Sequence, residues 1–200
     1  MSIAKTQVRA DRRAARDARP EAERALAGQR LVAHLLAGLH ERGVRSVAGY
    51  VPIGSEPGVD PGAGLALPES LRGAGLGLLL PLFRPDRDLD WAWYAGPASL
   101  VGGPRGLREP PAEVGLGLAA VATVELVVVP ALAVGLDGGR LGRGAGCYDR
   151  ALARVPAGVP LVALVYDDEL LASVPTEPHD RPVTDVITPT GGWQPLGYQL

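Results

Sequence analysis

The chain has 200 residues, of which 46% are hydrophobic, a formal net charge of −2 and one cysteine. This composition predicts one substantial domain with a packed core, and the small net charge argues against nucleic acid or an acidic membrane as a partner of the whole molecule. No apolar stretch approaches the ~20 residues that span a bilayer, the N-terminus lacks the apolar core of a signal peptide, and a single cysteine excludes an internal disulfide. A cytoplasmic protein is therefore expected.

Residues 3–19 predict a first helix that carries a basic stripe. Its side chains Lys5, Arg9, Arg12 and Arg16 lie within about 60° of one another on a helical wheel. A solvated basic face is the usual explanation of such a stripe. Engagement of a triphosphate or another polyanion, an Arg-rich transit peptide and a nucleic-acid arm are the alternatives.

A second helix is predicted from Pro20 to about Glu41. Proline and acidic residues suit the start of a helix, and Gly43 suits its end. The apolar face of this helix consists of Leu31, Val32, Leu35, Leu36 and Leu39. We expect the helices of residues 1–42 to pack on the rest of the domain.

The remaining chain alternates between apolar strands and short helices. Strands are predicted at 46–51, 76–82, 126–134, 160–166 and 183–188, and those at 76–82 and 126–134 are expected to be buried. Residues 89–94 alternate like an exposed strand in a hairpin, residues 60–73 predict a short helix, and another helix begins near residue 148. This alternation implies a single α/β domain over residues 1–200, with a largely parallel sheet flanked by helices in a Rossmann-like three-layer architecture.

The most informative segment is 138–150, which lies between the predicted strand 126–134 and the helix that follows. It holds five glycines in nine residues, from Gly138 to Gly146, so its backbone can turn tightly and leave N–H groups open to an anion. Three arginines in the segment add fixed positive charge and forked donors for phosphate or carboxylate. A strand, a glycine-rich loop and a helix start together predict an anion cradle.

This segment differs from two well-known phosphate-binding loops. It lacks the Gly-Lys-Ser/Thr ending of a Walker-type loop. The dinucleotide fingerprint requires a third glycine where this chain has Cys147 or Asp149, depending on the glycine from which one counts. A flexible surface loop is the alternative in a chain with 27 glycines, but such loops rarely carry three arginines, a tyrosine and an aspartate between two apolar elements.

Two aspartates are candidates for Mg²⁺ bound together with ATP. Asp149 directly follows the cradle, and Asp180 lies in a later proline-rich loop. The alternatives are that Asp149 stabilises a helix N-terminus and that Asp180 is a turn residue. Cys147 has no histidine nearby in sequence and is interpreted as a small packing residue, and the three histidines lack zinc-ligand spacing.

Segment 140–150, Arg-Leu-Gly-Arg-Gly-Ala-Gly-Cys-Tyr-Asp-Arg, resembles the most specific signature of the 5-formyltetrahydrofolate cyclo-ligases (methenyltetrahydrofolate synthetases). Weaker matches occur in the family's order over nearly the whole chain: Lys5-x-x-x-Arg9, Tyr50-Val51-Pro52 with Glu56, Leu80-Pro81-Leu82, Glu109-Pro110, Val129-Pro130-Ala131-Leu132-Ala133 and His179-Asp180-Arg181-Pro182-Val183. Two positions depart from the pattern. Cys147 replaces the first of two tyrosines, and Gly135 replaces a common acidic residue, with Asp137 two residues later.

The resemblance implies an enzyme that binds MgATP and 5-formyltetrahydrofolate. It would convert the folate to 5,10-methenyltetrahydrofolate and release ADP and phosphate. Phosphorylation of the formyl oxygen makes it a leaving group, and the neighbouring N-10 amine then closes the ring. Such a transfer depends on positioning and charge neutralisation more than on a protein nucleophile. The protein is expected to act as a monomer on these two small molecules.

The resemblance also implies the site residues. ATP would be bound by Lys5, Arg9, Arg140, Leu141, Gly142, Arg143, Gly144, Ala145, Gly146, Cys147 and Tyr148, with Arg140 and Arg143 as the catalytic residues. The folate would be bound by Arg9, Val51, Glu56 and Tyr148, with Glu56 accepting hydrogen bonds from the pterin nitrogens. Asp149 and Asp180 would hold Mg²⁺.

Three alternatives stay open at this point. A non-catalytic folate- or nucleotide-binding relative would bind without consuming ATP, and the departures at Cys147 and Gly135 favour it. An RNA-binding protein would use the basic first helix and show salt-sensitive affinity, but the net charge and the missing aromatic RNA motifs argue against it. A sugar-phosphate isomerase or an acyltransferase with the same architecture is the third, since fold alone does not fix function.

Overall fold

The computed structural model describes residues 3–58, 66–103, 106–177 and 180–197. In these residues the main sheet consists of β1 (Ser46–Ala48), β2 (Gly77–Phe83), β3 (Leu89–Trp93), β6 (Leu126–Pro130), β9 (Leu161–Leu164), β11 (Asp185–Thr188) and β12 (Gly192–Pro195). The strand order is β12-β11-β9-β6-β1-β2-β3. The inner strands run parallel, and each edge strand is antiparallel to its neighbour. The predicted largely parallel sheet is therefore confirmed.

Two small sheets and several helices complete the described part of the chain. The small sheets are β7 (Ala133–Gly135), β8 (Arg140–Leu141) and β10 (Leu170–Leu171), and the pair β4 (Val101–Gly102) and β5 (Arg108–Glu109). The α-helices are α1 (Ile3–Ala18), α2 (Glu21–Glu41), α3 (Ala66–Gly73) and α4 (Cys147–Leu152). Short 3-10 helices are η1 (Pro97–Ser99), η3 (Ala112–Val114), η4 (Leu118–Thr123) and η5 (Asp167–Glu169).

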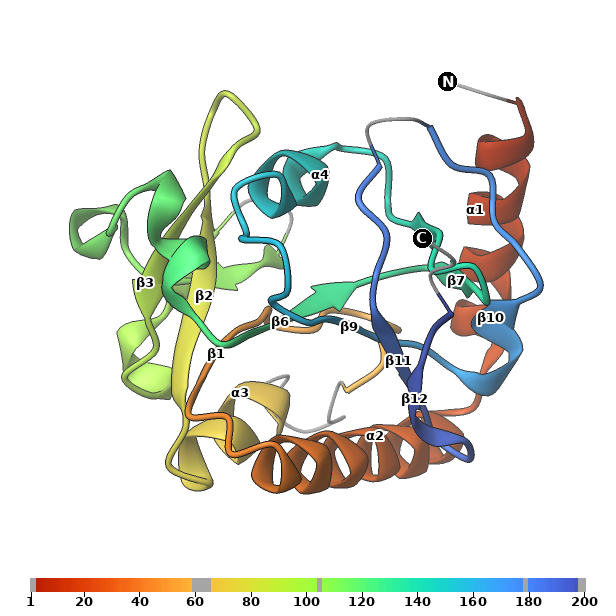
Figure 1. Cartoon of the computed structure of the whole chain (residues 1–200), viewed down its shortest axis with the longest axis horizontal. Coiled ribbons are helices and arrows are strands. Elements are labelled where there is room, and N and C mark those ends of the chain that lie inside the picture. The colour runs from red at the N-terminus through yellow and green to blue at the C-terminus, as the bar shows by residue number, and fades with distance from the viewer. Residues whose placement is uncertain (1–2, 59–65, 104–105, 178–179, 198–200) are drawn as a thin grey trace.

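The main sheet is covered on both faces, as Figure 1 shows, with α2 and α3 on one side and α4 on the other. Along β6, Leu126 and Val128 pack toward α2 and α3, whereas Val127 and Val129 pack toward α4 and η4. A parallel strand that is buried on both faces needs apolar residues at every position, which explains the uninterrupted valine run. This is the three-layer arrangement that the sequence predicts.

The predicted strand 126–134 is divided in two. β6 ends at Pro130, and after a turn the chain continues as β7, which pairs with β8 and β10 instead of the main sheet. At the break, the Leu132 N–H donates to the Leu141 carbonyl oxygen (2.7 Å). The sequence pattern does not reveal the break because both halves are buried, and burial is what an apolar run reports.

The predicted hairpin of residues 89–94 is confirmed, but its predicted exposure is wrong. β3 pairs with β2, and Leu89 and Trp91 are fully buried because Val121 of η4 packs over them. Trp93 alone among these three side chains is exposed. Of the helix predicted at 60–73, α3 is observed, whereas residues 60–65 lie outside the described residues, as does His179 of the late motif.

Candidate functional site

A pocket lies where the direction of the chain through the sheet reverses. β1 is flanked by β2 on one side and by β6 on the other, so the connections leave β1 and β6 in opposite directions and open a crevice at their carboxyl ends. Its lining includes Arg16, Tyr50, Val51, Ile53, Glu56, Pro81, Phe83, Leu107, Arg108, Pro130, Ala131, Leu132, Arg140, Gly142, Arg143, Gly144, Ala145, Gly146, Cys147, Tyr148 and Asp149. Arg140, the cradle residues 142–149 and the predicted folate residues Val51, Glu56 and Tyr148 therefore share one pocket, whereas Arg9 and Leu141 are not among its described lining residues.

The cradle turn runs from β8 to α4. Gly144 and Gly146 have φ angles of 95° and 71°, which side chains with a Cβ rarely adopt, so glycine is required at both positions. The backbone N–H groups of residues 143–145 donate no hydrogen bond to any described residue. Open N–H groups in a turn of this kind form a concave surface that attracts anions.

Two arginines of α1 hold the carbonyl side of the cradle. Arg9 Nε donates to the Gly142 oxygen (2.8 Å), and Arg13 Nη2 donates to the Arg143 oxygen (3.2 Å). The Arg9 guanidinium lies against Gly144, with its Cζ 3.2 Å from where a Cβ would stand. Arg9 thus lies beside the cradle, as the sequence predicts, although 133 residues separate it from Gly142.

Arg140 lies in the wall of the pocket and is almost completely buried. Its Nη2 forms an ion pair with Asp149, and its Nη1 donates to the Pro130 oxygen (3.3 Å). Its Nε is buried and has no hydrogen-bond partner among the described residues. The guanidinium therefore joins the end of β6 to α4 and keeps one donor free.

Arg143 and Glu56 form an ion pair of 3.0 Å between the cradle and the loop after β1. The other carboxylate oxygen of Glu56 accepts a hydrogen bond from the Ile53 N–H (3.0 Å). Burial raises the pKa of Glu56, and the positive charge of Arg143 opposes the rise. Half of the Arg143 side chain is exposed, so this residue can turn between Glu56 and a ligand in the cradle.

Tyr148 and Cys147 form the apolar base of the cradle. The Tyr148 ring meets Trp91 edge to face, with centroids 6.5 Å apart, and its hydroxyl donates to the Gly49 oxygen (3.4 Å). Burial raises the pKa of Tyr148 and of Cys147, so both side chains stay protonated at neutral pH. A buried, protonated thiol is a poor nucleophile, in agreement with its interpretation as a packing residue.

Lys5 and Asp180 contact each other, with 2.8 Å between Lys5 Nζ and Asp180 Oδ2, and Glu177 lies 3.4 Å from the same ammonium group. Neither Lys5 nor Asp180 is among the described lining residues of the pocket. Lys5 lies one helical turn before Arg9, which places the Lys5–Asp180 pair on the cradle side of α1. The described residues contain no cluster of three or more His, Cys, Asp or Glu side chains that could hold a metal ion by themselves.

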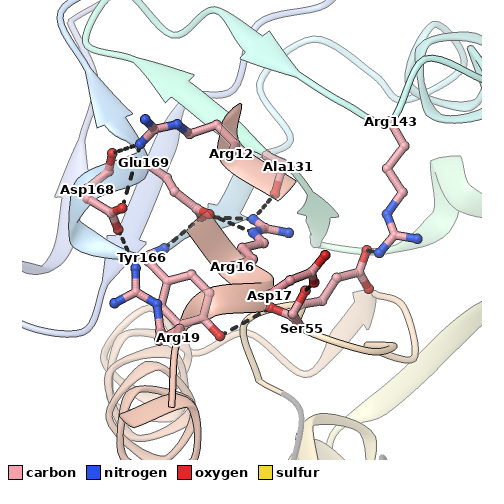
Figure 2. A network of polar contacts seen from close by, with 11 residues as sticks. Arg12, Arg16, Asp17, Arg19, Ser55, Ala131, Arg143, Tyr166, Asp168 and Glu169 are labelled. Atoms are coloured by element: carbon pink, nitrogen blue, oxygen red, sulfur yellow. Dashed lines mark hydrogen bonds and ion pairs between the residues drawn. The ribbon is translucent and has the colours of Figure 1, made fainter. Parts of the chain in front are cut away.

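The basic stripe of the first helix is not the solvated face that its sequence suggests. Lys5 is 5% exposed and Arg16 is 2% exposed. Arg16 forms a bidentate ion pair with Glu169, and Arg12 and Arg19 bind Asp168 (Figure 2). These contacts join α1 to η5. An acidic run directly after a strand, Asp167-Asp168-Glu169, is the sequence signal for such partners.

The departure at Gly135 is filled by its neighbour. The Asp137 carboxylate folds back and accepts a hydrogen bond from the Gly139 N–H (3.0 Å). Its Oδ1 occupies the space that a Cβ at position 135 would need. Asp137 thus puts an acidic group where the side chain of residue 135 would begin.

Comparisons with known proteins agree with this geometry. Residues 1–189 match the model of the 5-formyltetrahydrofolate cyclo-ligase family. A protein of Mycolicibacterium smegmatis named 5-formyltetrahydrofolate cyclo-ligase is 44% identical over 162 residues, which cover 78% of this chain and 79% of that protein. Across the described residues, no helix combines the length and the apolar character needed to cross a membrane.

Two solved structures have a similar fold. The NMR structure of Aquifex aeolicus 5,10-methenyltetrahydrofolate synthetase has a TM-score of 0.80 and 27% identity, and the match covers 99% of this chain and 96% of that one. A 5,10-methenyltetrahydrofolate synthetase from Mycoplasma pneumoniae has a TM-score of 0.70 and covers 91% of this chain and 96% of its own. At 18% identity the second match concerns the fold alone.

Proposed function

Because this chain belongs to the 5-formyltetrahydrofolate cyclo-ligase family, we propose that the pocket between β1 and β6 converts 5-formyltetrahydrofolate to 5,10-methenyltetrahydrofolate, with ATP as co-substrate. The chain is an enzyme of the ligase class, on which the family model and the 44% identical relative agree. We assign individual residues in and beside the pocket a role in binding ATP, the folate or Mg²⁺.

The reaction needs a better leaving group on the formyl carbon. Transfer of the γ-phosphoryl group of ATP to the formyl oxygen gives an imidate phosphate and ADP. The N-10 amine then attacks the carbon, a C–N bond forms, and the oxygen leaves as phosphate while the ring closes. Both steps depend on alignment and on neutralising the charge of the transferring group.

The observation that carries this assignment is a set of buried donors around the cradle. Arg140 Nε and Arg9 Nη1 are buried without a partner among the described residues, and the N–H groups of 143–145 are open. A buried donor left unpaired costs about 1–3 kcal/mol, so an anion that binds there is favoured. We assign the triphosphate to the cradle, with Arg140 and Arg143 stabilising the transferring group and Lys5 and Arg9 beside it.

The opposite wall of the pocket is assigned to the folate. Val51 and Tyr148 supply apolar surface for the pterin ring, and Glu56 accepts hydrogen bonds from its N–H groups. Because Arg143 pairs with Glu56 in the free protein, the two side chains must separate when the cradle holds phosphate and Glu56 holds the pterin. ATP in the cradle would draw Arg143 away from Glu56 and so leave Glu56 open to the pterin. A pterin bound to Glu56 would likewise leave Arg143 open to phosphate.

We propose that Mg²⁺ enters with ATP and is held by Asp149 and Asp180 together with phosphate oxygens. The donor set fits, since Mg²⁺ with a nucleotide takes one or two carboxylates and completes its shell with phosphate and water. Asp149 lies in the pocket wall, and Asp180 lies beside Lys5. When bound, Mg²⁺ neutralises phosphate charge. The basic partners of both carboxylates, Arg140 and Lys5, are the residues assigned to phosphate.

We also propose that the protein acts in the cytoplasm as a monomer on these two small molecules, without nucleic acid. The net charge of −2 supplies no general attraction for polyanions. Sedimentation at assay concentrations tests the monomer.

The direct test is a spectrophotometric assay for the methenyl product with folinate and MgATP, omitting each component in turn. Arg143→Ala is expected to reduce turnover ~10²–10³-fold while the far-ultraviolet circular dichroism stays unchanged, because one charged donor to the transferring group is lost. Arg30→Ala, an exposed arginine of α2, is the control and keeps full turnover. Near-normal turnover of Arg143→Ala would contradict the cradle assignment.

A further inference from the structure

The arginine at position 16 is a residue of the pocket wall that has no role in the assignments above. Arg16 lies on α1, about two turns after Arg9, and is 2% exposed, yet it lines the pocket. Nε and Nη2 bind the two carboxylate oxygens of Glu169 at 2.6 and 2.8 Å, and Nη2 also donates to the Ala131 oxygen (2.6 Å). Its Nη1 makes no hydrogen bond to any described residue. Figure 2 shows this nitrogen pointing away from Glu169, toward the side of the site from which Arg143 reaches in.

The Arg16 guanidinium is fixed in place and stays charged. Burial alone would lower the pKa of Arg16, but the ion pair with Glu169 raises it above its ordinary value. Three hydrogen bonds to Glu169 and Ala131 define the plane of the group, so its free donors have one direction. A buried ion pair contributes little net stability compared with apolar residues of the same size, so stability gives no reason for a cation here.

Arg16 lines the same pocket as the acceptor Glu56. Burial raises the pKa of Glu56, and three groups oppose that rise: Arg143 most strongly, then the Ile53 N–H, and then the positive charge of Arg16. The pocket therefore offers a carboxylate acceptor and, near it, a fixed cationic donor. This pairing complements a flat ring whose edge carries N–H donors next to a carbonyl oxygen.

The pterin ring has such an edge. Its 2-amino group and N3–H are adjacent donors, and the 4-oxo oxygen next to them is an acceptor. We propose that Arg16 is a specificity-determining residue that donates from Nη1 to the 4-oxo oxygen while Glu56 accepts from the neighbouring N–H groups. The inference rests on the proposed binding of the pterin at Glu56 and adds the residue that reads the other part of the same edge.

The test compares 5-formyltetrahydrofolate with its 4-thioxo analogue, which keeps N3–H and the 2-amino group but has a weaker acceptor at position 4. The wild-type enzyme is expected to favour the oxo compound in kcat/KM by about tenfold, the size expected of a hydrogen bond from a charged donor. In the double variant Arg16→Met/Glu169→Met, which replaces the ion pair by apolar groups, the preference falls to near one, with KM for ATP unchanged. A purely structural role would weaken both compounds alike.

Two further variants keep the result readable if the double variant fails to fold. Arg16→Lys keeps a positive charge near Glu169 but has no second terminal nitrogen to donate to the pterin. This variant is therefore also expected to lose the preference for the oxo compound. Arg12→Met, whose contacts lie outside the pocket at Asp168, is the matched control and retains it. A wild-type enzyme without preference, or a folded, active Arg16 variant that retains it, overturns the proposal. Absence of any methenyl product with the wild-type enzyme would instead defeat the proposed function.

Discussion

At the scale of single residues, the buried carboxyl of Glu56 is assigned to substrate binding and lowers the stability of the fold when it is ionised. Burial raises the pKa of this carboxyl above 4.5, and Arg143 and the Ile53 N–H only partly oppose the rise. A carboxyl whose pKa is higher in the folded than in the unfolded protein favours folding when protonated, and that contribution is lost as the pH rises through the folded pKa. Ionised Glu56 therefore destabilises the protein at neutral pH.

Glu56→Gln is expected to raise Tm at pH 7 and to raise KM for folinate by at least about tenfold, because a hydrogen-bond acceptor for the pterin is lost. The gain in Tm should shrink as the pH falls to 4.5 and below, where the wild-type carboxyl is also neutral. Differential scanning calorimetry over pH 4–8 measures it.

Glu125→Gln gives the contrast of opposite sign. The N–H groups of Arg45 and Ser46 lower the pKa of Glu125, so its contribution is present above 4.5 and is lost as the pH falls through the lowered pKa. This exposed variant should therefore lower Tm at pH 7 and leave the kinetics unchanged. An unchanged or lower Tm for Glu56→Gln at pH 7 would refute the reading of that site.

Asp149 gives a second prediction at this scale. Asp149→Asn is expected to raise the Mg²⁺ concentration for half-maximal turnover about tenfold, because a neutral amide is a weaker ligand than a carboxylate for this hard cation. Asp168→Asn, which loses ion pairs with Arg12 and Arg19 outside the pocket, is the control and should leave the Mg²⁺ titration unchanged. A titration that does not move in Asp149→Asn would exclude this residue as a ligand.

The residues that sequence could locate are those that lie close together in the chain. Segment 140–150 holds glycines, arginines and an aspartate within eleven residues, so its capacity to bind an anion can be predicted from the sequence. Arg16 and Glu169 are 153 residues apart, and an arginine destined for burial looks the same in sequence as one on the surface. The interpretation of the basic stripe of the first helix as a solvent-exposed face was wrong for that reason.

At the scale of elements, Gly38 shows how tightly α2 packs against the sheet. A Cβ at this position would overlap the indole of Trp193 in β12, which is held by a hydrogen bond to Asp185 (2.8 Å) and by the Arg42 guanidinium above the ring (4.1 Å). Gly38→Ala is expected to destabilise the protein by about 1–3 kcal/mol, although alanine is the better helix former, because overpacking outweighs propensity.

Thermal or urea unfolding measures this change. Gly73→Ala in α3 is the matched control, since its Cβ would meet no atom within 4 Å, and it should leave stability equal or slightly higher. Equal stability of the two variants would mean that Trp193 moves aside freely.

Elements with long apolar runs could be predicted, and short ones could not. The strands near 76–82, 160–166 and 183–188 and both N-terminal helices are found within about three residues of their predicted bounds. β8 and β10 have two residues each, too few for any periodicity, and β12 contains glycine and proline. These strands form because neighbours in space offer partners, which no local pattern records.

At the scale of the molecule, the two core layers share one sheet. Each inner strand contributes to both, so loss of one layer exposes the other, and the single domain predicted for residues 1–200 should unfold in one cooperative transition. Calorimetry should give equal calorimetric and van't Hoff enthalpies. A saturating ATP analogue with Mg²⁺, at ~100 times its Kd, should stabilise that single transition by about 2.7 kcal/mol. Two separated transitions would show independent units.

The pairing of the chain's beginning with its end has a consequence for biosynthesis. Lys5 finds its partner Asp180 only 175 residues later, and Arg16 waits for Glu169. On the ribosome the first helix therefore emerges long before Glu169 and Asp180, and it docks only after both have been synthesised. Nascent chains that stop before residue 169 contain this helix and the glycine turn but lack the two carboxylates that hold the helix in place, so the capacity to use ATP arises late in synthesis.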